Sequence, residues 1–207
     1  MSKRGLSTRE KYDRMARRYD LMELFPETLF FGRFRKALFG MIRGRTLLEV
    51  GVGTGKNIAY YPRDMEATAV DFSVEMLRRA RRRAERLRVP VTLREMDIES
   101  LQFETGRFDA VVSTFVFCSV PDPMKGLVEV KRVLKPDGTF YTLEHVRPKG
   151  QTLGKLFDRA APPIVDRTRV HIDRNTVDNI RNAGFDIELE RNLILDIFKM
   201  IVAKPAP

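Results

Sequence analysis

Two acids and three glycines form the stretch of this chain that is best suited to bind a ligand. Glu49 lies near the end of an apolar run, residues 46–50, and Gly51, Gly53 and Gly55 follow at alternate positions. Glycine is needed where the backbone turns sharply from strand into helix and where a ligand approaches the main chain closely. The stretch therefore predicts a buried strand, a tight turn and a helix that begins near Gly55.

A further acid follows at the spacing that nucleotide-binding sites use. Residues 67–70 read as a second strand, and Asp71 stands at its end, about twenty residues after Glu49. The glycine spacing differs from the dinucleotide fingerprint, and no lysine stands before a serine or threonine as in a P-loop. Asp71 can accept both hydroxyls of a ribose, and the alternative is a residue that only caps a helix. We favour the ribose.

The chain resembles the class I S-adenosylmethionine-dependent methyltransferases. The resemblance rests on the E-x-G-x-G-x-G sequence of residues 49–55, on Asp71, on Asp97 with Ile98, and on RVLKPDG at residues 132–138. It implies an α/β fold: a Rossmann-like, seven-stranded, mostly parallel sheet with helices on both faces and an N-terminal helical lid. It also implies S-adenosyl-L-methionine as the cofactor.

The resemblance further implies which residues hold that cofactor. Asp97 would reach the adenine amino group, and Ile98 would pack against the ring. The sequence YDRMARRYDLM, residues 12–22, is similar to the N-terminal signature of quinone-ring methyltransferases and bacterial phospholipid N-methyltransferases, in which the second tyrosine lies over the cofactor. The cofactor-binding residues expected on this basis are Tyr19, Glu49, Gly51, Gly53, Gly55, Asp71, Phe72, Met76, Asp97, Ile98 and Phe115.

Apolar periodicity and turn residues place the remaining elements. Further strands are expected at residues 91–96, 108–114, 139–146, 185–190 and 197–203, the last two as an antiparallel pair at the sheet edge. Helices are expected at residues 7–24, 55–61, 73–88, 122–134, 152–160 and 174–183. We divide the chain into a lid at 1–40 and a methyltransferase core at 41–207, within which 147–173 is an insertion that forms part of the acceptor pocket.

Composition limits the partners. The formal net charge of +10 favours nucleic acid or an anionic membrane surface. Cys118 is the single cysteine, no apolar run is long enough to span a bilayer, and no secretory signal is seen, so we expect a cytoplasmic protein, peripheral at the inner membrane face if it binds lipid. The two histidines stand far apart, so no metal site is expected.

Two segments combine basic and apolar residues. In residues 1–40, phenylalanines and basic residues are interleaved from Phe25 onward. The segment favours membrane contact, through Phe30 and Phe31, as much as packing over the cofactor. Seven arginines occupy the predicted helix at 73–88, and we interpret them as a solvated outer face.

Methyl transfer from a sulfonium requires alignment of nucleophile, methyl and sulfur, and it requires a base only where the acceptor must lose a proton. His145 is the candidate base, because it ends the predicted fifth strand over the site. Arg167, Arg169 and Arg174 are candidates to hold an acceptor phosphate, or else are rim charges. Cys118 is expected to be a small buried residue.

These features favour a methyltransferase that acts on an amphiphilic acceptor. The first candidate is the amino head group of a phospholipid such as phosphatidylethanolamine. The alternatives are a quinone ring carbon, then a thiol or another small molecule. A basic nucleic-acid-binding protein is disfavoured because residues 113–118, STFVFC, are apolar where a nucleobase amine would bind. A non-catalytic cofactor-binding scaffold is disfavoured because the acids and glycines are intact.

Overall fold

The computed structural model describes residues 31–147, 159, 174–194 and 196–207. Within them one sheet has the strand order β3-β2-β1-β4-β5-β7-β6. The strands are β1 (Thr46–Val50), β2 (Glu66–Asp71), β3 (Thr92–Glu95), β4 (Phe108–Thr114), β5 (Leu134–His145), β6 (Phe185–Ile194) and β7 (Phe198–Pro205). Strands β1 to β5 pair in parallel, and β7 runs antiparallel to both β5 and β6. The predicted Rossmann-like sheet is confirmed.

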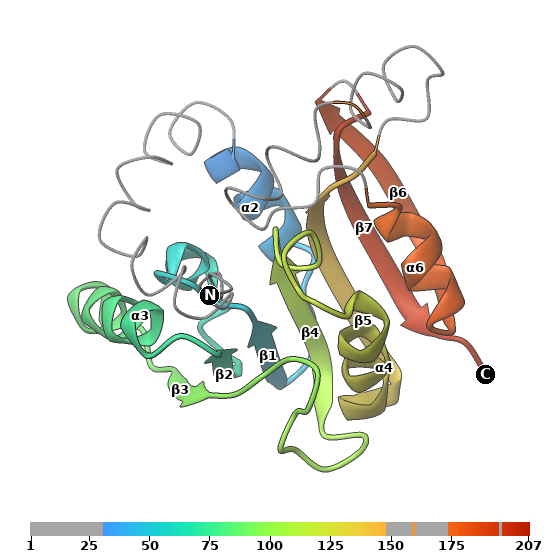
Figure 1. Cartoon of the computed structure of the whole chain (residues 1–207). Helices are drawn as coiled ribbons and strands as arrows, with labels where there is room; N and C mark the ends of the chain where they lie inside the picture. The colour runs from blue at the N-terminus through green and yellow to red at the C-terminus, as the bar shows by residue number, and fades with distance from the viewer. Residues whose placement is uncertain (1–30, 148–158, 160–173, 195) are drawn as a thin grey trace, which may run out of the picture.

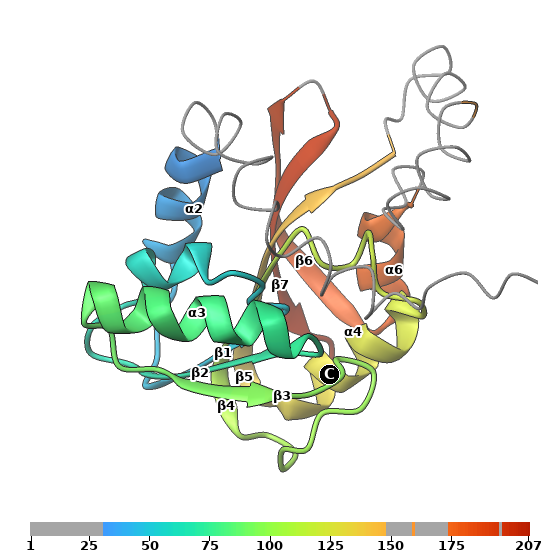
Figure 2. The same ribbon diagram turned by 60° about the vertical axis from the view of Figure 1, so that its left-hand side comes forward.

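Helices cover both faces of this sheet (Figures 1 and 2). One face packs against α2 (Gly32–Phe39), the short 3-10 helix η2 (Lys56–Tyr60) and α3 (Val74–Leu87). The other face packs against α4 (Pro123–Val133) and α6 (Thr176–Asn182). Neighbouring residues of a central strand are therefore both buried: Leu47 and Leu48 of β1 point to opposite faces and have 0% exposure.

Helix α3 shows how the sequence sets its own boundaries. The Ser73 hydroxyl accepts a hydrogen bond from the Met76 amide at 3.2 Å, which caps the first turn. Arg88 ends the helix in the left-handed conformation. Leu77, Ala80 and Ala84 form the buried stripe that the sequence predicts, while the arginines are exposed or half-buried.

Two predicted elements differ in detail. The helix expected at 55–61 is a single short 3-10 segment, because Pro62 follows at once and leaves no room for longer α-helical hydrogen bonding. The K-P-D-G sequence at 135–138 is not a separate turn before the fifth strand but lies within β5, whose register against β4 jumps from Leu134 to Thr139. The helices expected at 7–24 and 152–160 lie outside the described residues, apart from residue 159.

The amino ends of the parallel strands are joined by Asp109 of β4. Its carboxylate accepts hydrogen bonds from the Arg45 and Thr46 amides, each at 2.9 Å, and from the Thr46 hydroxyl, and it pairs with Lys135 at 2.5 Å. Gly44 is required here, because its φ is +124° and a Cβ would lie 2.4 Å from the Asp109 Cβ. The start of β1 is thus held firmly against β4.

Candidate active site

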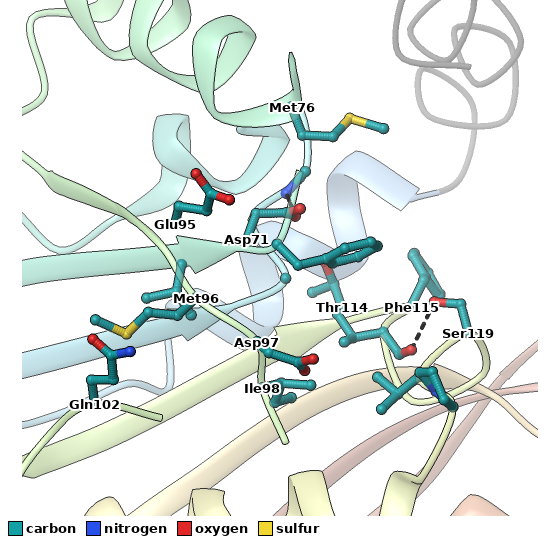
Figure 3. Close-up of a pocket in the computed structure, with 17 residues that line it drawn as sticks. Asp71, Met76, Glu95, Met96, Asp97, Ile98, Gln102, Thr114, Phe115 and Ser119 are labelled. Carbon is teal, nitrogen blue, oxygen red and sulfur yellow. Dashed lines mark hydrogen bonds between the residues drawn. The ribbon is translucent and has the colours of Figure 1, made fainter. Parts of the chain in front are cut away.

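A cavity of about 680 Å³ opens at the carboxyl ends of β1, β2 and β4 (Figure 3). The strand order reverses here, because the chain leaves β3 at one side of β1 and continues with β4 at the other. Ligands of doubly wound sheets bind at such a reversal. The lining residues are Gly51, Gly53, Val70, Asp71, Phe72, Met76, Glu95, Met96, Asp97, Ile98, Gln102, Thr114, Phe115, Val116, Ser119, Val120 and Pro121.

The glycine turn brings the main chain to this cavity. All three glycines have positive φ, which side chains rarely adopt. A Cβ on Gly51 would lie 2.5 Å from Val116 Cγ2, and a Cβ on Gly53 would meet nothing within 4 Å. Gly55 lies away from the lining and faces Ile58 and Ala80. Gly51 and Gly53 are therefore the two glycines placed to approach a ligand.

Asp71 is the last residue of β2 and stands between the turn and α3. One carboxylate oxygen accepts the Gly53 amide at 2.8 Å, and the other accepts the Ser73 amide at 2.9 Å. The residue lines the cavity. The geometry fits a carboxylate that braces the glycine turn and accepts the hydroxyls of a ribose.

The end of the cavity beyond Asp71 suits a flat, partly apolar group. Asp97 and Ile98 lie there, next to Met96 and Gln102 (Figure 3). The Asp97 carboxylate accepts the Glu99 amide at 2.9 Å, which fixes its orientation. Gln102, Glu95 and, on the opposite side, Ser119 also line the cavity, but no motif marks them in the sequence.

Glu49 occupies a different place from the one expected of a residue that touches the cofactor. It is 1% exposed and absent from the lining, and it accepts hydrogen bonds from the Tyr61 hydroxyl and, at 2.6 Å, from the Asn57 amide. Arg35 of α2 donates to Asn57 and to Thr114, each at 2.6 Å. Burial, opposed by these donors and by Arg35, raises the pKa of Glu49 to about 7. Direct contact between Glu49 and a cofactor stays a prediction.

His145 ends β5, as predicted, but it does not line the cavity. Its ring packs edge-on against Phe198 with the centroids 5.1 Å apart. Burial lowers its pKa to about 4, so the imidazole is neutral at pH 7 and a weak base. Its role as the base stays a prediction.

Other predicted site residues are placed as follows. Cys118 is buried, as expected. The Arg174 guanidinium donates to the carbonyl oxygens of Phe117 and Val120, each at 2.6 Å, so it serves the loop after β4. Tyr19, Phe30, Arg167 and Arg169 lie outside the described residues.

The chain matches the family model of the methyltransferase domain over residues 48–142. It is 33% identical over 181 residues to the thiol S-methyltransferase TMT1B of Rattus norvegicus, covering 84% of this chain and 73% of that protein. The chain belongs to the class I S-adenosylmethionine-dependent methyltransferases. It is also 40% identical over 121 residues to a phosphatidylethanolamine N-methyltransferase of Cereibacter sphaeroides, covering 57% of this chain and 60% of that protein. A crystal structure of a SAM-dependent methyltransferase from Thermotoga maritima shares the fold, with a TM-score of 0.73 at 20% identity over 96% of this chain and 99% of that one.

The cavity of this methyltransferase fits S-adenosylmethionine in its donor set. Gly51 and Gly53 offer open main chain, Asp71 an oriented carboxylate, and Asp97 with Ile98 a polar and an apolar contact for the adenine. When bound, the cofactor supplies an activated methyl group on a sulfonium. Thr114, Phe115 and Ser119 lie at the other end of the cavity (Figure 3).

No helix within the described residues has the length and apolar character that a bilayer crossing requires. No group of three or more His, Cys, Asp or Glu side chains in the same part of the chain is arranged to hold a metal ion.

Proposed function

We propose that this methyltransferase acts on an amphiphilic acceptor, and that the amino head group of a phospholipid is the first candidate. The observation that carries the proposal is an aromatic wall made of Phe31, Phe115 and Phe198. Phe31 lies 4.9 Å from Phe115 and 5.1 Å from Phe198 between ring centroids, and Phe115 lines the cavity. All three rings are partly exposed.

The aromatic wall joins three parts of the chain at one end of the sheet. Phe31 precedes α2, Phe115 follows β4 and Phe198 begins β7. The residue expected to touch a membrane, Phe31, therefore packs edge-on against the other two rings. An apolar surface of this kind suits the non-polar part of an acceptor.

The aromatic wall also favours the reactive form of an amine. An attacking amine must be neutral, and removal from water lowers the pKa of an ammonium group. Neutral His145 beside Phe198 adds no positive charge at pH 7. Desolvation by the wall therefore replaces a strong base in this proposal, with in-line positioning supplying most of the rate.

The relatives support a lipid or small-molecule acceptor, but they differ in whether nitrogen or sulfur receives the methyl group. One relative is named for phosphatidylethanolamine and another for thiols. The formal charge of +10 suits a surface of anionic lipid. Thiol S-methylation is the second candidate, because that relative is similar over 84% of this chain.

Purified protein with labelled S-adenosylmethionine and a total membrane lipid extract would test the proposal. We expect label in a phospholipid head group after chromatography. Label in the neutral quinone fraction, or only on a soluble thiol such as dithiothreitol, would reject the head group and identify the alternative. No label in any lipid, with cofactor binding intact, would reject an amphiphilic acceptor.

A pair of variants tests the aromatic wall itself. Phe198→Leu should raise the KM for the lipid acceptor about tenfold, because it removes a ring from the wall. Phe103→Leu is the matched control, since the Phe103 ring packs edge-on against Phe108 and is not part of the aromatic wall. Equal KM values in the two variants would remove the wall from the acceptor site.

A further inference from the structure

The loop at residues 115–120, which we call the β4 loop, forms the acceptor side of the cavity and is strained. Phe115, Val116, Ser119 and Val120 all line the cavity. Phe115 has φ of 59°, a left-handed conformation that costs a non-glycine residue about 1–2 kcal/mol. A strained backbone persists only where its surroundings hold it.

Two charged side chains hold the β4 loop: Glu144 binds its amide N–H groups, and Arg174 binds its carbonyl oxygens. The Glu144 Oε1 atom accepts hydrogen bonds from the Val116 amide at 3.2 Å and the Phe117 amide at 3.3 Å. Arg174 donates to carbonyl oxygens of the same loop, at Phe117 and Val120. The loop in turn presses Val116 against Gly51 of the cofactor turn.

We propose that Glu144 is a positioning residue of this methyltransferase, whose ionised carboxylate holds the β4 loop in the conformation that shapes the acceptor side of the cavity. This proposal rests on the proposed function in one respect: it takes this side of the cavity as the place where the acceptor binds. Its test observes the loop itself and needs no acceptor, so the two can fail separately.

The surroundings of Glu144 make its hydrogen bonds to the β4 loop depend on pH. The side chain is 0% exposed, and within the described part of the chain it forms no ion pair and its Oε2 atom has no hydrogen-bond partner. Lys199 is its cross-strand neighbour, but the ammonium group binds Glu190 at 2.9 Å and Asp196 at 2.6 Å. Arg174 faces the loop carbonyls. Burial therefore raises the pKa of Glu144 to about 7.

Two neutral hydroxyls of the described residues also contact Glu144, and burial lowers the pKa of the adjacent His145 to about 4, so that imidazole is neutral between pH 6 and 8. Thr142 and Ser113 contact Oε1 at 3.2 and 3.5 Å and contact each other at 2.8 Å. An ionised carboxylate accepts amide hydrogen bonds more strongly than a neutral carboxyl does. If the loosened loop leaves Glu144 buried, loss of the two amide hydrogen bonds raises the pKa of its carboxyl further. By linkage, protonation then favours the loosened loop and deprotonation secures it, although the same buried acid stabilises the whole fold against unfolding when it is protonated.

The loop contains its own reporter. Cys118 is the single cysteine of the chain, is 3% exposed, and its thiol lies 3.5 Å from the Phe115 carbonyl oxygen. The rate of its reaction with N-ethylmaleimide reports opening of the loop. At each pH this rate is divided by the rate for a free cysteine peptide of measured thiol pKa, which corrects for ionisation of the thiol. In the full-length wild type we expect this corrected rate to rise about fivefold as the pH falls from 8 to 6.

Three variants assign the change to Glu144. Glu144→Gln should react quickly at every pH, without the step. Glu49→Gln, which removes the other buried acid of similar pKa, should keep the step. Arg174→Gln should react faster than wild type at every pH and keep the step as well.

Several results would overturn the proposal. They are the absence of a step in the wild type, a step that persists in Glu144→Gln, and a step that disappears in Glu49→Gln instead. The wild-type result decides the matter even where Glu144→Gln fails to give a thermal unfolding transition by circular dichroism.

Discussion

The two ends of the sheet place their carboxylates in opposite surroundings. At the amino end, amide donors and the Lys135 ammonium outweigh burial and hold the pKa of Asp109 well below its usual range. At the carboxyl end, burial outweighs the hydrogen bonds and raises the pKa values of Glu49 and Glu144 to about 7. One end stabilises an ionised acid, and the other keeps two acids near the point of protonation.

The difference follows from what each end must do. The amino end only has to join β1 to β4, so its acid can be fully satisfied. The carboxyl end has to leave a cavity open and hold a strained loop and two glycines around it. Acids with perturbed pKa values are typical of the second kind of place.

The largest effect is expected from Asp109→Ala. The change leaves the Arg45 and Thr46 amides and the Lys135 ammonium without their acceptor, which should lower the free energy of unfolding by about 2–4 kcal/mol. Urea unfolding would measure it. Asp137→Ala, an exposed acid at the same end of the sheet, is the control and should change stability by less than about 0.5 kcal/mol. Equal losses would show that Asp109 is not the clamp.

At the carboxyl end the expected loss is in binding. Asp71→Asn should weaken the binding of S-adenosylhomocysteine about 30-fold, as measured by calorimetric titration. A neutral amide accepts hydrogen bonds from ribose hydroxyls less well than a carboxylate does. Asp64→Asn, an exposed acid in the loop before β2, should leave the affinity unchanged. Unchanged affinity in Asp71→Asn would remove Asp71 from the cofactor site.

The dependence of stability on pH should show both ends at once. Because the pKa values of Glu49 and Glu144 are raised from 4.5 to about 7, their contribution is complete below pH 4.5 and is lost as the pH rises to 7. The loss is at most about 1.4 kcal/mol per pH unit for each acid. The contribution of Asp109 is present above its unfolded pKa of 3.8 and is lost in stronger acid.

Unfolding by urea between pH 3 and 8 would measure these slopes. The double variant Glu49→Gln/Glu144→Gln should lose the decline between pH 5 and 7 and keep the loss in acid. A decline that survives in the double variant would contradict the contrast between the two ends.

The smallest effect is expected from Lys135→Met. Its side chain is 38% exposed, and an exposed ion pair contributes only about 0–1 kcal/mol. A loss in urea unfolding as large as that of Asp109→Ala would show that charge pairing, and not the amide donors, makes the amino-end clamp.

The parts of the fold and of the site that could be predicted are those marked by residues close together in the sequence. The glycines and Asp71 lie next to strand ends that apolar runs identify, so their meeting at one cavity followed from the parallel sheet. Arg35 could not be placed in the same way, because Thr114, its partner, stands far along the chain. The role of Glu144 was hidden for the same reason, since its bonds to the β4 loop depend on the pairing of β4 with β5.

Residues 148–173 connect β5 to α6, and a hydrogen bond of 3.0 Å from the Arg147 amide to the Arg174 carbonyl oxygen joins the two residues that flank them. Because these two flanking residues are adjacent in space, the segment between them is a suitable place to replace one sequence with another. Because the entropic cost of chain closure rises by only about 0.6 kcal/mol per doubling of length, we expect the sheet to tolerate inserts of different length between Arg147 and Arg174.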